Sequence, residues 1–303
     1  NGLFYEINGQ TIIDHVGGVD DLNNATIRVI GDPTKRITRD PVRMMRVIRH
    51  SARNGFEIEP TSWSAVCENN RILALCPPSR LRDELLKDLY SGYSLQWYEL
   101  SRKSGLFTVL FKPYSNTLDA RLSDGKTCTE LLTATFRTID RINNFCRAKG
   151  IHRQPDYFLL AFILIPWAIR TFDIFRKPTS GSQLFQFSKK LRENLNNNIG
   201  PQLNLKRSTR QEITTLLTHL PSIAAHKQEH SWPKWLKRKS YFQKCRLLFY
   251  YWMEATRSEP VPEALLSTGK TSHPALPVKQ GRKSAYNRRG RPAFTTCTTK
   301  SIF

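Results

Sequence analysis

Paired cysteines and long apolar segments are both absent from this chain. The six cysteines form no CxxC pair and do not gather with histidines, so a zinc site is not expected. A chain of 303 residues buries a core without disulfides, and we expect free thiols and a reducing, cytoplasmic location. The most apolar run, Tyr157 to Ile169, is too short to span a bilayer and contains Pro166. It is expected to form a buried helix, with no membrane contact.

Acidic residues are scarce relative to basic ones. The chain has 47 Lys and Arg against 25 Asp and Glu, a formal net charge of +22. Residues 1–60 hold eight of each sign, whereas residues 205–257 hold eleven basic and three acidic, and residues 261–303 hold eight and one. This gradient favours a polyanion such as RNA as the partner of the C-terminal part, although a chain can also be basic only for solubility.

Periodic patterns predict a short hairpin followed by helices. Strands are expected at residues 3–5 and 11–16, joined by a turn at Asn8-Gly9. Ser79, after two prolines, is the expected N-cap of one helix. Residues 258–303 have no apolar period and are expected to be disordered when free. The expected helices lie near residues 40–54, 61–70, 79–91, 94–104, 127–148, 155–171, 183–197, 208–220 and 240–256.

The segment from Ile12 to Arg53 concentrates groups that suit an anionic ligand. Asp14 ends an apolar strand before the Gly17-Gly18 turn, and Asp40-Pro41 predicts a helix start with Asp40 as N-cap. Steps of four and three place one set of cationic side chains on a single helix stripe, namely Arg39, Arg43, Arg46, His50 and Arg53. An apolar stripe for core packing holds Val42, Met45, Ile48 and Ala52. The basic stripe is expected to contact a nucleoside triphosphate or RNA.

Three motifs follow one another along the chain: DxxGGxxDL at residues 14–22, then IGDP and DPVRMMR up to residue 46, then R-x-x-x-E-x-x-K at Arg80, Glu84 and Lys87. Together they resemble the motifs of the class II nucleotidyltransferases, the family of bacterial poly(A) polymerases and CCA-adding tRNA nucleotidyltransferases. Family members carry GGxVRD, a D-x-D pair and RRDFT upstream. The opening residues 1–5 resemble the stretch directly after RRDFT in those enzymes. The resemblance therefore implies a fragment that begins inside the catalytic head, lacks two Mg²⁺-binding carboxylates and is itself inactive.

The resemblance also implies roles for individual residues. Asp14 matches the third active-site carboxylate, a ligand of Mg²⁺, although it could equally bond the amides of the glycine turn. Asp40 and Arg43 match the pair that reads the nucleotide base, and Arg46 and Arg49 would approach the triphosphate or stiffen the site. The family usually has Glu where Arg39 stands, which puts the bracing of the base-reading pair in question. For Arg80, Glu84 and Lys87 a structural role is favoured over direct chemistry, with Glu84 and Lys87 forming an ion pair within one helix.

The C-terminal half resembles bacterial poly(A) polymerases in residues 155–167, in NLKRSTRQEITTLL and in the closing GRKSAYNRRGRP. Residues 231–252 mix aromatic and basic side chains, which suits single-stranded RNA because bases stack on rings beside phosphate contacts. Phe249 and Trp252 fit the core better, whereas Trp232 and Trp235 are candidates for exposure. The expected RNA-binding residues are Trp232, Lys234, Trp235, Lys237, Arg238, Lys239, Arg282, Lys283, Arg288, Arg289 and Arg291.

The expected fold is mainly α. Residues 1–38 would be the C-terminal remnant of an α/β nucleotidyltransferase head, 39–112 a helical neck for nucleotide recognition and RNA binding, 113–257 a helical body, and 258–303 a disordered basic tail. By resemblance, the intact protein adds AMP from ATP to RNA 3′ ends with Mg²⁺ and no template. CCA addition to tRNA is the alternative, and a non-catalytic RNA-binding protein is a second one. An RNA helicase or RNA-decay proteins are candidate partners.

Overall fold

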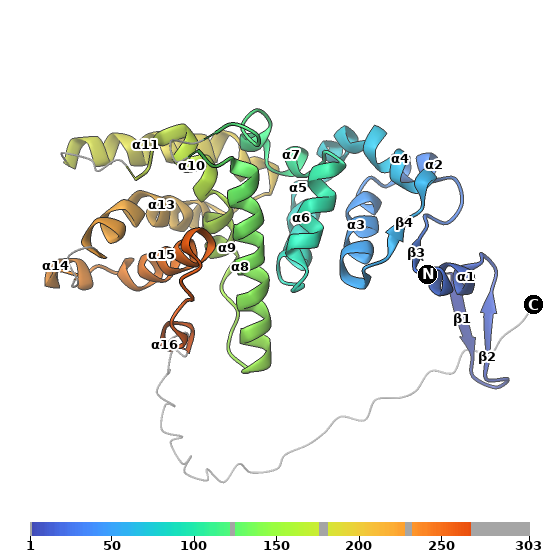
Figure 1. Ribbon diagram of the computed structural model, residues 1–303. Coiled ribbons are helices and arrows are strands. Elements are labelled where there is room, and N and C mark those ends of the chain that lie inside the picture. Colours follow the sequence, from blue (N-terminus) through green and yellow to red (C-terminus); the bar gives the residue numbers. More distant parts are fainter. Residues whose placement is uncertain (1, 122–124, 176–180, 228–231, 268–303) are drawn as a thin grey trace, which may run out of the picture. The chain divides into compact units, whose positions relative to one another are not determined.

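The computed structural model describes residues 2–121, 125–175, 181–227 and 232–267 (Figure 1). The chain begins with an antiparallel hairpin of β1 (Leu3–Glu6) and β2 (Thr11–Asp14), in which Leu3 pairs with Asp14. The predicted hairpin is confirmed. Its connection is a four-residue turn, 7–10, which has the predicted Asn8-Gly9 at its centre and in which Gln10 has a φ of 50°.

A short helix and a two-stranded parallel sheet come after the hairpin. The helix α1 (Gly18–Asn23) leads into β3 (Thr26–Ile27), which pairs with β4 (Glu57–Ile58). The helices α2 (Pro33–Arg39) and α3 (Arg43–Asn54) lie between these strands in the sequence. The parallel pair and α1 and α2 were not predicted, because none of these short elements repeats an apolar period often enough to show it.

The region after β4 is helical. Its elements are α4 (Pro60–Glu68), η1 (Asn70–Leu75), α5 (Pro78–Leu89), α6 (Ser94–Lys103), α7 (Leu106–Leu110) and η2 (Lys112–Tyr114). The α5 helix starts one residue before Ser79, which makes no cap there. The helices α4 and α5 each begin with a proline. The first N–H groups of a helix have no partner within the helix, so proline loses no hydrogen bond there, and its fixed φ suits a helix start.

The α3 helix departs from prediction at its first turn. Asp40 (φ −145°, ψ 85°) is the C-cap of α2, and α3 begins only at Arg43 with Val42 as its N-cap, so Asp40 does not cap α3. The sequence pattern placed Arg39 on the same helix stripe as Arg43 and Arg46. In the structure Arg39 belongs to α2, so it does not share that stripe. The apolar stripe is confirmed, since Val42, Met45, Ile48 and Ala52 are all buried.

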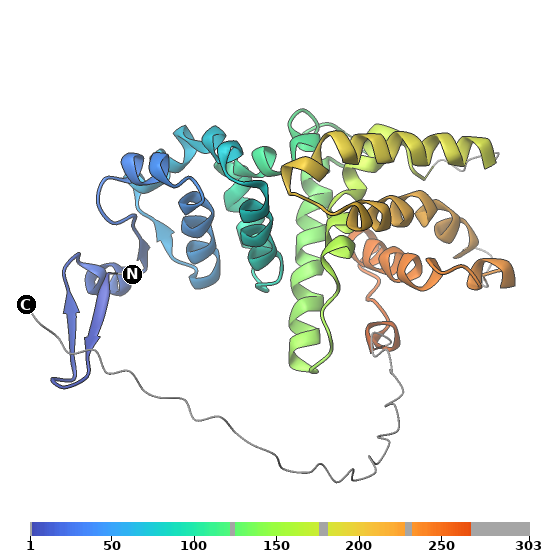
Figure 2. The same cartoon turned by 180° about the vertical axis from the view of Figure 1, so that it is seen from behind.

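A second group of helices begins after residue 125 (Figures 1 and 2). It comprises α8 (Cys128–Ala148), α9 (Asp156–Ile163), α10 (Ile165–Phe172), α11 (Gly181–Asn197), α12 (Ile199–Gln202), α13 (Arg207–Lys227), α14 (Lys234–Lys237), α15 (Phe242–Arg257) and α16 (Glu263–Ser267). The α8 helix begins with a capping box, in which Thr127 and Glu130 satisfy each other's backbone N–H. The mainly α fold expected from the sequence is confirmed.

The helix predicted at residues 155–171 is buried but divided. Because Pro166 has no N–H to donate, the α9 ladder ends and a new helix begins at Ile165. The buried Tyr114 hydroxyl fastens this junction, since it donates to the Ile163 carbonyl at 2.5 Å and accepts from the Trp167 amide at 3.1 Å. Among the described helices, none combines the length and the apolar character that crossing a bilayer requires.

The described residues extend to residue 267, beyond residue 258, where the tail was expected to start, and the rest of the predicted tail lies outside them. The α16 helix was not predicted, and Val261 and Leu266 are both buried. The Glu254 carboxylate also accepts from the Val261 amide at 2.8 Å. Two apolar residues separated by five positions leave too little periodicity to predict such a helix from the sequence.

Candidate functional site

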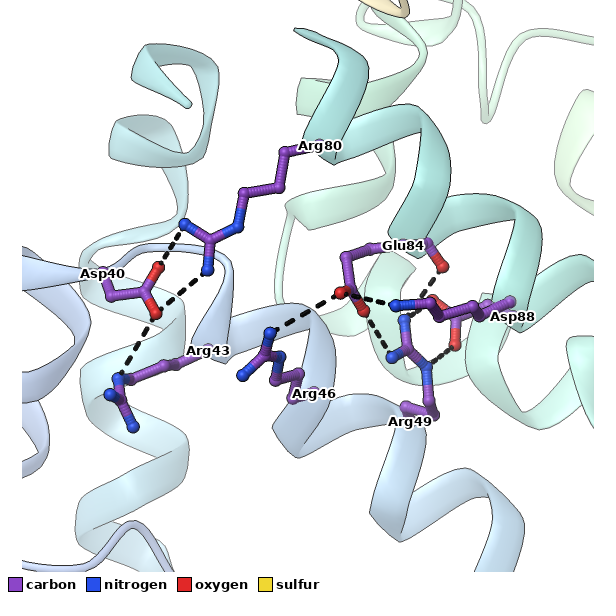
Figure 3. Close-up of polar contacts among 8 residues, drawn as sticks. Asp40, Arg43, Arg46, Arg49, Arg80, Glu84 and Asp88 are labelled. Atoms are coloured by element: carbon purple, nitrogen blue, oxygen red, sulfur yellow. Dashed lines mark hydrogen bonds and ion pairs between the residues drawn. The ribbon is translucent and has the colours of Figure 1, made fainter. Parts of the chain in front are cut away.

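The bend between α2 and α3 presents Asp40 to the first turn of α5. Arg80 faces the Asp40 carboxylate with its planar fork: Nη1 lies 3.0 Å from Oδ1, and Nη2 donates to Oδ2 at 3.2 Å (Figure 3). Arg43, in the first turn of α3, places its Nε 3.6 Å from Asp40 Oδ2. The two predicted base-reading residues, Asp40 and Arg43, are therefore neighbours, and both are partly open to solvent, at 21% and 44% of their side-chain surface.

The residue that braces Asp40 is Arg80 and not Arg39. Arg39 ends α2 in an exposed position, and within the described part of the chain it makes no ion pair. The bracing of Asp40 comes instead from Arg80, forty residues further along the chain. This contact was not predicted, since the sequence places Arg80 in a family motif but gives no measure of its distance from Asp40.

The centre of α3 is fastened to α5 by a buried cluster of charges. Arg49 donates to Asp88 through Nε at 2.5 Å and Nη2 at 3.1 Å, and to Glu84 Oε2 through Nη1 at 2.5 Å (Figure 3). Its Nη2 also donates to the Glu84 carbonyl at 2.9 Å. With 9% of its side chain exposed, Arg49 is enclosed, so its contacts are those of a stiffening residue and not of a triphosphate ligand.

Glu84 receives further cations at the rim of this cluster. Lys87 donates to Glu84 Oε1 at 3.0 Å, which is the ion pair predicted within the helix, and Arg46 Nη2 lies 3.6 Å from the same oxygen. Burial opposes ionisation of Glu84, but the hydrogen bonds and charges of Arg49 and Lys87 outweigh it and lower its pKa to about 2. Arg46 keeps 47% of its side chain exposed and so has donors available for a ligand.

Asp88 is the member of this site that sequence reasoning missed. It is 1% exposed, and burial raises its pKa to about 6 although the hydrogen bond and charge of Arg49 act in the opposite direction. Burial would lower the pKa of Arg49, but the hydrogen bonds that Arg49 donates to Asp88 and Glu84, with the negative charges of those groups, outweigh it and raise the pKa. The available signal was the spacing: Asp88 lies one helical turn beyond Glu84 on a face that is otherwise apolar.

Asp14 occupies the turn before α1. Its Oδ1 accepts from the amides of Val16 and Gly18, both at 3.0 Å, and its Oδ2 accepts from Val19 at 2.9 Å. These amide bonds, with that of Val19 the largest cause, lower the pKa of Asp14 to about 2. The sequence left two roles open for Asp14, a ligand of Mg²⁺ or an acceptor for the amides of the glycine turn. The contacts in the structure are those of the second role.

The described residues do not by themselves fit a magnesium site. Asp14 Oδ1 already accepts two hydrogen bonds and Oδ2 one, which leaves a single lone pair for a metal ion. No group of three or more His, Cys, Asp or Glu residues arranged to hold a metal ion occurs in the described ranges. Mg²⁺ needs near-octahedral oxygen ligands, so these residues supply at most one of them.

The aromatic and basic segment around α14 is exposed only in part. Trp232 is half-buried, because its indole N–H donates to the Ile223 carbonyl at 3.3 Å and its ring packs edge-on against Phe242 and Tyr250. The expectation that Trp232 is exposed was therefore wrong, whereas Trp235 is 54% exposed. Phe249 and Trp252 belong to the core, as predicted. The predicted cations Lys234, Lys237, Arg238 and Lys239 are all exposed.

The remaining predicted RNA-binding residues, Arg282, Lys283, Arg288, Arg289 and Arg291, lie outside the described residues. Among the cysteines, those at 67, 76, 128, 146 and 245 are free thiols, as expected.

Comparison with known proteins identifies the helical region that contains α5. Residues 55–118 match the family described as the probable RNA- and SrmB-binding site of polymerase A. Poly(A) polymerase I of Haemophilus influenzae is 34% identical over 166 residues, which cover 55% of this chain and 35% of that protein. The CCA-adding enzyme of Lactobacillus helveticus is 35% identical over 100 residues, which cover 33% of this chain and 25% of that enzyme. The matched part thus spans about a third or less of these relatives.

A solved structure shares the fold over a longer stretch. The Bacillus stearothermophilus CCA-adding enzyme in complex with CTP superimposes with a TM-score of 0.52 over 86% of this chain and 53% of that one, at 18% identity. The superposition shows a shared fold, and the sequence matches make the chain similar to RNA nucleotidyltransferases. Its matched segments are similar to those of the class II nucleotidyltransferases, the family of the bacterial poly(A) polymerases and the CCA-adding enzymes.

Proposed function

We propose that the full-length protein adds AMP from ATP to RNA 3′ ends without a nucleic-acid template, with α3 reading the incoming base. The observation that carries this proposal is the pair of Asp40 and Arg43, partly exposed, adjacent, and held by Arg80. Arg80 donates to Asp40 Oδ2, which keeps a second lone pair for a ligand, whereas Oδ1 is buried beside Arg80 Nη1.

The chemistry of this pair selects for a particular hydrogen-bonding edge. Asp40 accepts from an exocyclic amine, while Arg43 donates to the neighbouring ring nitrogen. Adenine and cytosine both present an amine beside an unprotonated ring nitrogen, whereas guanine and uracil present a carbonyl beside an N–H. The pair thus favours ATP and CTP over GTP and UTP. It does not by itself separate ATP from CTP.

Arg46 and Arg49 divide the remaining tasks. Arg46 lies one turn beyond Arg43, is half exposed, and is the residue of α3 placed to contact the triphosphate. Arg49, by contrast, holds α3 in a fixed position on α5 through its hydrogen bonds to Glu84 and Asp88. A base-reading pair needs such a rigid support, because a small displacement of a hydrogen-bonding group loses its selectivity. If Asp14 contributes to a magnesium site, the other ligands must come from outside the described residues.

The longer match to a poly(A) polymerase supports AMP addition over CCA addition. The poly(A) polymerase matches extend over up to 168 residues, against up to 124 for the CCA-adding enzymes. The likeness of fold to a CCA-adding enzyme with bound CTP keeps CCA addition as the second candidate.

An extension assay on the full-length protein separates these functions. A labelled RNA is incubated with each of the four nucleotides in turn, and a tRNA that lacks its CCA end is incubated with CTP and ATP together as a second substrate. The proposal predicts a long AMP tract on the RNA with ATP alone. Restricted addition of two C residues and one A to the tRNA would instead establish CCA addition. Binding of RNA without any incorporation would establish a non-catalytic RNA-binding protein.

A further inference from the structure

The corner where α8 ends and α9 begins carries a concentrated positive charge that the base-reading site does not use. From residue 141 to residue 155 the sequence has four Arg or Lys and no Asp or Glu. Three of these cations, Arg147, Lys149 and Arg153, are exposed at the corner, and His152 lies between the last two. Arg147, His152 and Arg153 also line a hollow of about 390 Å³ against Tyr90, with no acidic residue in its wall.

Arg153 is held in place by a ring and not by an acid. Its guanidinium lies 4.0 Å from the centre of the Tyr90 ring. Among the described residues it makes no ion pair, and the acid nearest to it in the sequence, Asp156, is occupied by the Tyr90 hydroxyl at 2.8 Å. Stacking through its face leaves the N–H groups at the edge of a guanidinium free, and that edge matches the oxygens of a phosphate.

The platform beneath Arg153 is itself rigid. The Tyr90 hydroxyl lies 2.8 Å from the Gln154 carbonyl as well as from Asp156, so it ties the loop to α5. Burial, with the bond to Asp156, raises the pKa of Tyr90 well above its ordinary value, which keeps the hydroxyl a donor. Arg147 fastens the other wall, because its Nη2 donates to the Ser91 carbonyl at 3.1 Å.

We infer that this corner, Arg153 stacked on Tyr90 with His152 in the same hollow and the exposed Lys149 nearby in the sequence, is a contact site for the phosphate backbone of RNA. The inference rests on the proposed action on RNA and gives that RNA a second contact, remote in sequence from the base-reading residues of α3. Tyr90 lies within the segment that matches an RNA-binding family, which connects the corner with RNA more than with a free anion. Because the groups meet phosphates, the corner strengthens binding without selecting a sequence.

The test measures binding of the full-length protein to a fluorescent single-stranded RNA across a series of salt concentrations, without nucleotide. Arg153→Ala should weaken binding about tenfold and reduce the slope of log affinity against log salt by about 0.7, the contribution of one phosphate contact on a single strand. Arg153→Lys keeps the charge but loses the planar fork, so it should retain the slope and recover only part of the affinity. Arg192→Ala, an exposed arginine on α11, is the matched control and should change neither quantity.

The outcomes separate this site from the proposed function. Loss of affinity and slope in Arg153→Ala, with an unchanged circular dichroism spectrum and an unaffected Arg192→Ala, supports the site. If the wild type binds RNA and Arg153→Ala binds it equally well with the same slope, the corner is not an RNA contact although the proposed function stands. If the wild type binds no RNA, both proposals fail.

Discussion

Arg49 is the side chain on which the contact between α3 and α5 depends. It supplies the compensating charge for two carboxylates, Glu84 and Asp88, that are 4% and 1% exposed. Removing one partner of a buried ion pair leaves the other charge without compensation, which costs about 3–5 kcal/mol. We therefore expect Arg49→Met, a substitution of similar length, to lower the free energy of unfolding by that amount in urea titrations.

The matched control for this prediction is Arg71→Met. Arg71 is an exposed arginine of η1 in the same helical region, and such surface substitutions change stability by about 0.5 kcal/mol or less. Equal unfolding midpoints for the two variants would show that the buried cluster does not stabilise this region.

Asp14 gives a second prediction at the residue scale. Its carboxylate accepts from the amides of Val16, Gly18 and Val19, at and just before the start of α1. In Asp14→Ala these amides lose their acceptor, and we expect faster hydrogen exchange at all three, while amides in α3 exchange as in the wild type. Unaltered exchange at Gly18 and Val19 would show that the turn is held by other contacts, and would reopen the metal-ligand role.

At the scale of elements, the attachment of α3 to α5 should depend on pH through Glu84. Its pKa is lowered from an ordinary value of 4.5 to about 2, so the folded state favours the ionised form. The stability that Glu84 contributes is therefore complete above pH 4.5 and is lost as the pH falls towards 2. The difference in unfolding free energy between wild type and Glu84→Gln should shrink over that range. A difference that stays constant with pH would show that the charge of Glu84 is not what fastens α3 to α5.

The sequence predicted α8 well, whereas α13, predicted at 208–220, continues to Lys227, and the joints between helices were predicted poorly. The predicted helix at residues 127–148 matches α8 to within one residue, since its apolar period continues through six turns. The start of α3 was predicted at Asp40-Pro41, whereas the helix begins at Arg43 and Asp40 ends α2. The division of residues 155–171 results from a single proline.

The same limit applies to the candidate site. Asp40, Arg43, Arg46 and Arg49 could be identified because they share one short motif. The contacts that give them different roles, from Arg80 to Asp40 and from Arg49 to Asp88, join residues about forty positions apart. Such contacts depend on how α3 packs against α5, and a periodic pattern within one helix contains no information on that.

At the scale of the whole molecule, we propose that residues 268–303 provide much of the non-specific attraction to RNA. They hold eight Lys or Arg and no Asp or Glu. Each phosphate neutralised on a single strand contributes about −0.7 to the slope of log affinity against log salt. Deleting these residues should flatten the slope by several such contributions and weaken binding equally for different sequences.

The boundary of this deletion is set by the structure. Because Val261 and Leu266 are buried, a cut at residue 261 would remove part of the core, whereas a cut after Ser267 retains both. An unchanged slope in the variant that ends at residue 267 would show that these cations do not bind RNA.

The central claim is that Asp40 and Arg43 read the incoming base, and nucleotide selectivity of Arg43→Ala tests it most directly. Incorporation of each of the four nucleotides into RNA is measured with the full-length wild type, Arg43→Ala and the control Arg192→Ala. Loss of a charged hydrogen bond of about 2–3 kcal/mol predicts that AMP incorporation falls by tens- to hundreds-fold and that the preference for ATP over GTP and UTP is lost. Discrimination among the four nucleotides that equals that of the wild type would contradict the account.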